Sequence, residues 1–98
     1  MANICDNTMR VITESENNKE AVKSFFQTWG WGYCFDEDDY EFRVYFESKW
    51  DFPEEEMKKL YESLPNKKDC YITCLSVEYG NLYCALWTCD ENGWTYIT

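Results

Sequence analysis

Carboxylates are the side chains of this sequence that could do chemistry, and most of them lie in one segment. Between Asp36 and Glu62 the chain has eleven acidic residues and four basic ones, so the segment carries −7 of the net charge of −10. Paired carboxylates can catalyse glycoside hydrolysis, and clustered carboxylates can bind Ca²⁺. The run Asp36-Glu37-Asp38-Asp39 lacks the alternating spacing and the following glycine of an EF-hand loop. We therefore expect no metal site here, and a cation-dependent small enzyme is the least favoured alternative.

Other catalytic groups are missing from the sequence. Histidine is absent, which excludes Ser-His and Cys-His nucleophile pairs and every mixed Cys/His metal site. The six cysteines include no Cys-x-x-Cys, and we interpret them as buried free thiols, with disulfides and metal or redox chemistry as alternatives. Gly30 and Gly32 follow a predicted helix, whereas a phosphate-binding loop precedes one. The sequence thus predicts a protein that is not an enzyme and has no cofactor.

The net charge restricts the partners of the protein. A charge of −10 on 98 residues argues against direct binding to nucleic acid or to an anionic membrane, because both are negatively charged. The charge favours a basic protein partner; the alternative is that it only keeps an aromatic-rich domain in solution. The sequence has no apolar run of membrane-spanning length, and its first residues lack the features of a secretory signal. We therefore expect a cytoplasmic protein.

Alternating apolar residues predict two strands in the first half of the chain. In residues 7–13, Met9 and Val11 share one face. Residues 40–47 alternate more regularly, and the face expected to be buried holds Tyr40, Phe42, Val44 and Phe46. Residues 31–35 are rich in aromatic side chains and fit either a short strand or an ordered loop over the sheet.

A hairpin is predicted in the second half of the chain. Residues 70–79 and 82–89 flank Gly80-Asn81, a pair suited to a two-residue turn. In this register Leu75 pairs with Leu86, within one continuous apolar face that also pairs Val77 with Cys84. The opposite face pairs Cys74 with Trp87. Residues 94–97 are a further candidate strand.

Two amphipathic helices separate the strands. The first begins at Ser15 or Asn17 and ends near Trp29; its apolar stripe is Val22, Phe25, Phe26 and Trp29. The second begins near Pro53 and ends at Pro65; its stripe is Met57, Leu60, Tyr61 and Leu64. The order β-α-β-α-β-β, with an optional last strand, predicts a single α+β domain over residues 1–98. We expect a ferredoxin-like sandwich, with two helices on one face of a four- to five-stranded, mainly antiparallel sheet.

Two short motifs resemble a known family, the YubB-like ferredoxin-fold proteins. Asn3-Ile4-Cys5-Asp6-Asn7-x-x-x-Val11 resembles the opening motif of that family, and Phe46-Glu47-Ser48-Lys49-Trp50-Asp51-Phe52-Pro53 resembles its strand-to-helix junction. The resemblance implies a ferredoxin-like fold and occurrence in phages, plasmids or other mobile elements. It supplies no catalytic residues. Small acidic proteins of such elements often inhibit host defence, as anti-CRISPR proteins do.

The acidic residues are the candidate partner-binding site. Glu54, Glu55 and Glu56 begin a predicted helix, and the helix dipole accounts for them. The run at residues 36–39, expected to be an exposed loop, and the acids on the solvent-facing side of the strand at 40–47 have no such reason. The predicted site therefore consists of Asp36, Glu37, Asp38, Asp39, Glu41, Tyr45 and Glu47.

Three functional hypotheses follow from these residues. The first is a mobile-element protein that binds and inhibits a basic nucleic-acid-processing protein in the host cytosol, as an anti-CRISPR protein or a DNA mimic does. The second is a non-catalytic structural module that forms a homodimer through a strand edge or through Trp31, Tyr33 and Tyr45. The third is the cation-dependent enzyme considered above.

Overall fold

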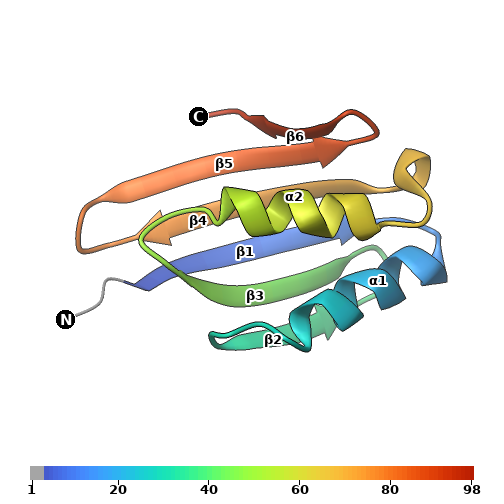
Figure 1. Ribbon diagram of the computed structural model, residues 1–98, viewed down its shortest axis with the longest axis horizontal. Coiled ribbons are helices and arrows are strands. Elements are labelled where there is room, and N and C mark those ends of the chain that lie inside the picture. Colours follow the sequence, from blue (N-terminus) through green and yellow to red (C-terminus); the bar gives the residue numbers. More distant parts are fainter. Residues whose placement is uncertain (1–3) are drawn as a thin grey trace.

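The computed structural model describes residues 4–98, which form one antiparallel sheet and two α-helices (Figure 1). In chain order the elements are β1 (Ile4–Ile12), α1 (Glu16–Phe26), β2 (Tyr33–Glu37), β3 (Phe42–Lys49), α2 (Glu54–Ser63), the short 3₁₀-helix η1 (Lys67–Asp69), β4 (Tyr71–Glu78), β5 (Tyr83–Asp90) and β6 (Gly93–Tyr96). The strand order across the sheet is β2-β3-β1-β4-β5-β6, and every neighbouring pair is antiparallel.

Both helices cover the same face of the sheet, α1 toward the β2 side and α2 toward the β4 side (Figure 1). The core between the two layers includes Val22 and Phe26 from α1, Met57 and Leu60 from α2, and Met9, Val11, Phe42, Val44, Phe46, Ile72 and Cys74 from the sheet. The predicted α+β class with two helices on one face is confirmed. The predicted strand count is wrong, because residues 4–98 form six strands in the order β-α-β-β-α-β-β-β rather than four or five.

The strand that the sequence analysis left unassigned is β2. It forms one edge of the sheet, and its five residues are all exposed. Tyr33 and Phe35 pack against Phe26, with ring centroids 6.0 and 6.4 Å from the Phe26 centroid. Charged residues are common on edge strands because they discourage pairing with other chains. The prediction of an exposed loop at residues 36–39 is therefore wrong for Asp36 and Glu37, which end β2.

The predicted burial pattern of β3 is confirmed except at its start. Phe42, Val44 and Phe46 are buried, whereas Tyr40 is 89% exposed. The Asp38 carboxylate accepts hydrogen bonds from the backbone N–H groups of Tyr40 and Glu41, at 2.8 and 2.9 Å. This local turn precedes β3, so Tyr40 is outside the alternation that the strand imposes on its neighbours.

The hairpin of β4 and β5 has the predicted register, including the Leu75–Leu86 and Cys74–Trp87 pairs. Its continuous apolar face, however, is the one that the helices leave open, and Leu75 is 44% exposed. The buried face of β4 instead holds two polar residues whose groups are satisfied locally. The Ser76 hydroxyl donates to Asn7 Oδ1 at 2.6 Å, and the Glu78 carboxylate accepts from two backbone N–H groups of the following turn.

Both helices begin as predicted, but α1 ends three residues early. The Ser15 side chain caps α1 by accepting from the Asn18 N–H at 3.2 Å. The helix ends at Phe26, and Trp29 lies in the following turn. The indole N–H of Trp29 donates to the Glu47 carbonyl at 2.7 Å, which attaches the end of this turn to β3.

Candidate partner-binding site

The predicted acidic site is arranged around one arginine. Arg43, on β3, lies 2.7 Å from an Asp36 oxygen and 3.1 Å from an Asp38 oxygen, and it also binds the Glu41 carboxylate. The hydrogen bond with Asp36, followed by that with Glu41, raises the pKa of the Arg43 guanidinium above its ordinary value. The pKa of Asp38 is lowered, first by the backbone N–H of Tyr40 and then by that of Glu41. The carboxylates of the β2–β3 turn are therefore paired with an arginine side chain of the same hairpin, Arg43.

A lysine of α1 partners another of the predicted acids. Lys19 Nζ lies 2.8 Å from a Glu37 oxygen, and this hydrogen bond lowers the pKa of Glu37. Within residues 4–98, Asp39 is the member of the run that forms no ion pair. The expectation that these acids have no structural reason is therefore wrong for Asp36, Glu37 and Asp38. Sequence reasoning missed it because the pairing cations lie on other elements.

The last two predicted residues lie away from this turn. Tyr45 and Glu47 are on the face of β3 that the helices leave open, and Tyr45 is 40% exposed. Glu47 Oε1 accepts a hydrogen bond from the Gly32 N–H at 3.3 Å. The structure thus divides the predicted site into a self-paired turn and two residues on the open sheet face.

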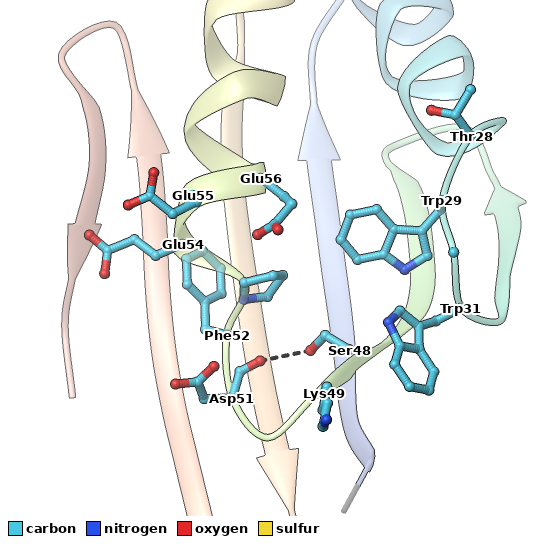
Figure 2. A pocket seen from close by; sticks show the side chains of 12 residues that line it. Thr28, Trp29, Trp31, Ser48, Lys49, Asp51, Phe52, Glu54, Glu55 and Glu56 are labelled. Atoms are coloured by element: carbon cyan, nitrogen blue, oxygen red, sulfur yellow. Dashed lines mark hydrogen bonds between the residues drawn. The ribbon is translucent and has the colours of Figure 1, made fainter. Parts of the chain in front are cut away.

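A separate cleft of about 640 Å³ opens between the loop after α1 and the first turn of α2 (Figure 2). Its lining residues are Thr28, Trp29, Gly30, Trp31, Ser48, Lys49, Asp51, Phe52, Pro53, Glu54, Glu55 and Glu56. The cleft joins three segments that are distant in sequence: the turn after α1, the end of β3 and the start of α2. The turn after α1 contributes the aromatic residues Trp29 and Trp31, and the start of α2 contributes acidic residues.

Two tryptophans form one side of the cleft (Figure 2). Trp29 is held in place by its hydrogen bond to Glu47 and by edge-on packing against Phe46, with ring centroids 5.4 Å apart. Trp31 is 41% exposed. A fixed indole beside an exposed one gives an apolar surface over which a planar cation can stack.

Carboxylates lie on the opposite side of the cleft. Glu56 extends from the first turn of α2 toward Trp29, whereas Glu54 and Glu55 point to the other side of the helix (Figure 2). Glu54 is paired with Lys58 at 3.4 Å, and Lys49 is the basic residue among those that line the cleft. Glu56 is therefore the carboxylate that faces the tryptophans, and its neighbours add to the negative potential around it.

The base of the cleft is tied to the centre of the sheet. Ser48 donates to the Asp51 carbonyl at 2.7 Å and accepts from the Asn7 side-chain amide at 2.9 Å. The same Asn7 amide donates to the Phe46 carbonyl, and its oxygen accepts from Ser76. Asn7 is 2% exposed, so this network is buried and joins β1, β3 and β4. It contains residues of both family-like motifs; Asn3 of the first motif lies outside the described residues.

The junction between β3 and α2 carries one strained residue. Trp50 has φ of 77°, in the left-handed region, and its side chain is 50% exposed. Phe52, two residues on, is 4% exposed and stacks on Trp87 with ring centroids 4.5 Å apart. The junction thus directs one aromatic ring into the core and another into solvent, beside the cleft.

Sequence reasoning missed the cleft although its parts were visible. Trp29 was assigned to the core stripe of a helix, and the acids at 54–56 were assigned to the helix dipole. Trp29 packs against the core from the turn after α1, and the three acids do lie in the first turn of α2, but neither assignment shows that the end of α1 faces the start of α2. The available signal was the Trp-Gly-Trp sequence at 29–31 together with an acidic first turn.

The cysteines take two environments. Cys5, Cys70, Cys74 and Cys89 are buried free thiols, whereas Cys34 and Cys84 are free and exposed. Burial raises the pKa of Cys74 to about 12 and that of Cys89 to about 12, so neither is a thiolate near neutral pH. The expectation of burial is therefore wrong for Cys34 and Cys84, which lie on the open face of the sheet.

Two further observations concern the part of the chain that the structure describes. Over residues 4–98, no three His, Cys, Asp or Glu side chains come together as a metal site would need. Neither α1 nor α2, the helices of these residues, has the length and apolar content needed to cross a membrane.

Comparisons with known proteins give no relative. No protein family, no curated protein and no solved structure matches this chain. The likeness to the YubB-like family therefore stays a prediction from the two motifs.

Proposed function

We propose that this chain is a non-catalytic binding protein whose cleft holds a basic segment of a protein partner. The observation that carries the proposal is the placement of Trp29 and Trp31 across the cleft from Glu56. An arginine side chain fits both walls, since its guanidinium stacks on indole rings and donates paired hydrogen bonds to a carboxylate. Stacking of a cation on an exposed aromatic ring contributes about 0.5–1 kcal/mol, and about 2 kcal/mol when the pair is desolvated.

The predicted acidic residues have a secondary role in this proposal. Asp36, Asp38 and Glu41 are paired with Arg43, so they have less to offer a partner than unpaired carboxylates would. They still contribute to the net charge of −10, which attracts a basic protein over distances of about one Debye length. The six acidic residues of the predicted site therefore steer the encounter, and the cleft makes the main contact.

The proposed partner is a basic nucleic-acid-processing protein of a host cell, inhibited in the cytoplasm by this product of a mobile element. The acidic charge supports the choice of a basic partner, because nucleic-acid-binding surfaces are rich in Lys and Arg. The two family-like motifs support the mobile-element setting. Such an inhibitor occupies basic groups that would otherwise contact phosphates, as anti-CRISPR proteins and DNA mimics do.

We also propose a ferredoxin-like core for this chain. The strand order β2-β3-β1-β4, with α1 joining β1 to β2 and α2 joining β3 to β4, is consistent with the β-α-β-β-α-β arrangement of that fold. On this reading β5 and β6 extend the sheet beyond the core. The cleft then lies at the end of the sheet where the chain passes from α1 to β2 and from β3 to α2.

The cleft is tested with a fluorescently labelled octa-arginine peptide at low salt. We expect binding that weakens with salt, a loss of about tenfold in affinity in Trp31→Ala, and about threefold in Glu56→Gln. Asp39→Asn is the matched control, because it removes one exposed carboxylate at the β2–β3 turn; it should change affinity less than twofold. Equal losses in Glu56→Gln and Asp39→Asn would show general charge attraction and contradict the cleft assignment.

The inhibitory role is tested separately with host proteins. The tagged chain is used to capture proteins from host lysate at low salt and release them at high salt. We expect captured proteins to bind duplex DNA, and DNA to displace them from wild-type chain. A captured protein that binds DNA equally well with and without this chain would contradict inhibition by competition, without affecting the peptide result.

A further inference from the structure

The face of the sheet opposite the helices has an ordered surface. The register of the strands sets its side chains in rows that run across the sheet. The central row is Cys34, Tyr45, Thr8, Leu75 and Leu86, from β2, β3, β1, β4 and β5 in turn. Leu75 and Tyr45 are 44% and 40% exposed, although each lies in the middle of a strand. The row crosses five strands and is apolar except for the Thr8 hydroxyl at its centre, with Thr8 and Leu86 half-buried.

Charged residues lie on the two sides of the apolar row and differ in sign. Arg10 and Arg43 pair on one side, and Asp6 and Glu47 pair on the other. The Arg10 side chain is 58% exposed and has one acidic neighbour, at 4.0 Å. Each pair lies two residues along the strands from the row, about 6.6 Å from it. Arg43 is already paired with Asp36, Asp38 and Glu41, so Arg10 is the more available cation on one side of the row, whereas Asp6 and Glu47 make the other side acidic.

The open face is much less acidic than the rest of the molecule. Its charged residues are Asp6, Asp36, Glu41, Glu47, Asp90, Arg10, Arg43 and Lys49, five acids and three bases, so it contributes −2 to the net charge of −10. A basic partner is attracted more strongly to other surfaces. The face with the least charge and the longest apolar row is suited to a partner with the same properties.

We propose that this partner is a second copy of the chain, and that two open faces pack together about a two-fold axis along the apolar row. Rotation about this axis reverses the strand direction, so each side of the row meets the other side in the second copy. Arg10 then faces Asp6 of the second copy, and Arg43 faces Glu47. An axis along β1 would instead place Arg10 against Arg10 and Asp6 against Asp6, which like-charge repulsion opposes.

The size of the face is adequate for such a dimer. Six strands of four to nine residues, spaced about 4.8 Å apart, cover roughly 600 Å². Stable protein interfaces bury about 800 Å² on each partner, so we expect a reversible dimer rather than a permanent one. The dimer leaves the cleft free, because the cleft opens on the helix side, and it does not depend on the proposed function.

The oligomeric state tests the proposal. We expect sedimentation velocity to show a mass that rises from monomer to dimer between micromolar and millimolar concentration. Leu75→Lys should weaken the dimer at least tenfold. Leu82→Lys makes the same change at a residue that is 89% exposed in the β4–β5 turn, and should leave the dimer within twofold of wild type. A monomer at every concentration, or equal effects of the two variants, would overturn the proposal.

Charge exchange tests the axis. Arg10→Asp places acid opposite acid and should weaken the dimer about tenfold, whereas Arg10→Asp combined with Asp6→Arg restores opposite charges across the interface. We expect the double variant to return within about threefold of wild type. Circular dichroism establishes that both variants are folded. A double variant no better than Arg10→Asp alone would overturn the arrangement.

A cysteine pair gives an independent check. Cys34 lies in the row on the axis and faces Cys34 of the second copy, whereas Cys84 pairs with Val77 beside the row and faces Thr88. Both thiols are exposed and the other four are buried. A short bis-maleimide should therefore give a covalent dimer that Cys34→Ser abolishes and Cys84→Ser preserves. The reverse pattern would contradict the axis.

Discussion

The β2–β3 turn and the cleft between α1 and α2 are both acidic, but their charges are used differently. In the turn, Asp36, Asp38 and Glu41 surround Arg43, and the carboxylates stabilise the local structure. In the cleft, Glu56 faces two tryptophans, one of them exposed, across an open space. The number of acids in a segment therefore does not measure the charge that is available to a partner. What matters is where the pairing cations lie.

The largest expected effect is a loss of stability when Phe52, a residue that lines the cleft, is truncated. Phe52→Ala removes a buried ring stacked on Trp87 and should lower the free energy of unfolding by about 3–4 kcal/mol. Octa-arginine binding should fall with it, because the start of α2 loses its packing. Tyr40→Ala, at the tip of the turn, should change stability by less than about 0.5 kcal/mol. Urea unfolding measures the change in the free energy of unfolding for both variants. Similar losses of stability would contradict the difference between the two regions.

Removing the cation of the turn should affect stability but not binding. Arg43→Gln leaves three carboxylates close together without their shared partner, so the melting temperature should fall. Affinity for octa-arginine should stay within about twofold of wild type, because the main contact lies at the cleft. A clear rise in affinity would instead assign the turn a binding role. Thermal melts and peptide titration of the same variant decide between these outcomes.

Acid should destabilise the β2–β3 turn. The pKa values of Asp38 and Glu37 lie below their ordinary values of 3.8 and 4.5, so both carboxylates bind protons more weakly in the folded state. Their stabilisation is complete above about pH 5.5 and is lost as pH falls through 4.5 and 3.8 and below. Asp38→Asn should flatten the fall of melting temperature between pH 6 and pH 3, whereas Asp39→Asn should follow wild type. Parallel curves for all three proteins would contradict the assignment.

The smallest expected effect concerns the strained residue beside the cleft. Trp50→Gly relieves a left-handed backbone and should raise stability by up to about 1 kcal/mol, less the loss of the Lys49 contact 5.4 Å from its ring. If the exposed ring also contacts the partner, the more stable variant should bind octa-arginine about two- to threefold more weakly. A loss of stability would mean that the ring packs more firmly than its exposure indicates.

The elements with a strong local pattern could be predicted from the sequence. The register of β4 and β5, the buried face of β3 from Phe42 onward and a start of α1 at Ser15 or Asn17 follow from alternation, turn residues and capping, which act between near neighbours. The strand β2 could not be chosen over an ordered loop, and its end at Asp36 and Glu37 was missed, because an exposed edge with acids lacks the burial pattern that marks a strand.

Which groups meet depends on tertiary contacts. Alternation gives two faces of the β4–β5 hairpin but does not say which face the helices cover; the covered face holds Ser76 and Glu78, whose polar groups form hydrogen bonds with Asn7 and with the following turn. Likewise, Arg43 and Lys19 pair with the acidic run, while Trp29 and Glu56 come together across the cleft. The contacts of Lys19 with Glu37 and of Trp29 with the start of α2 join residues that are distant in sequence, and the pairing of Arg43 depends on the turn between β2 and β3, so neither composition nor periodicity predicts them.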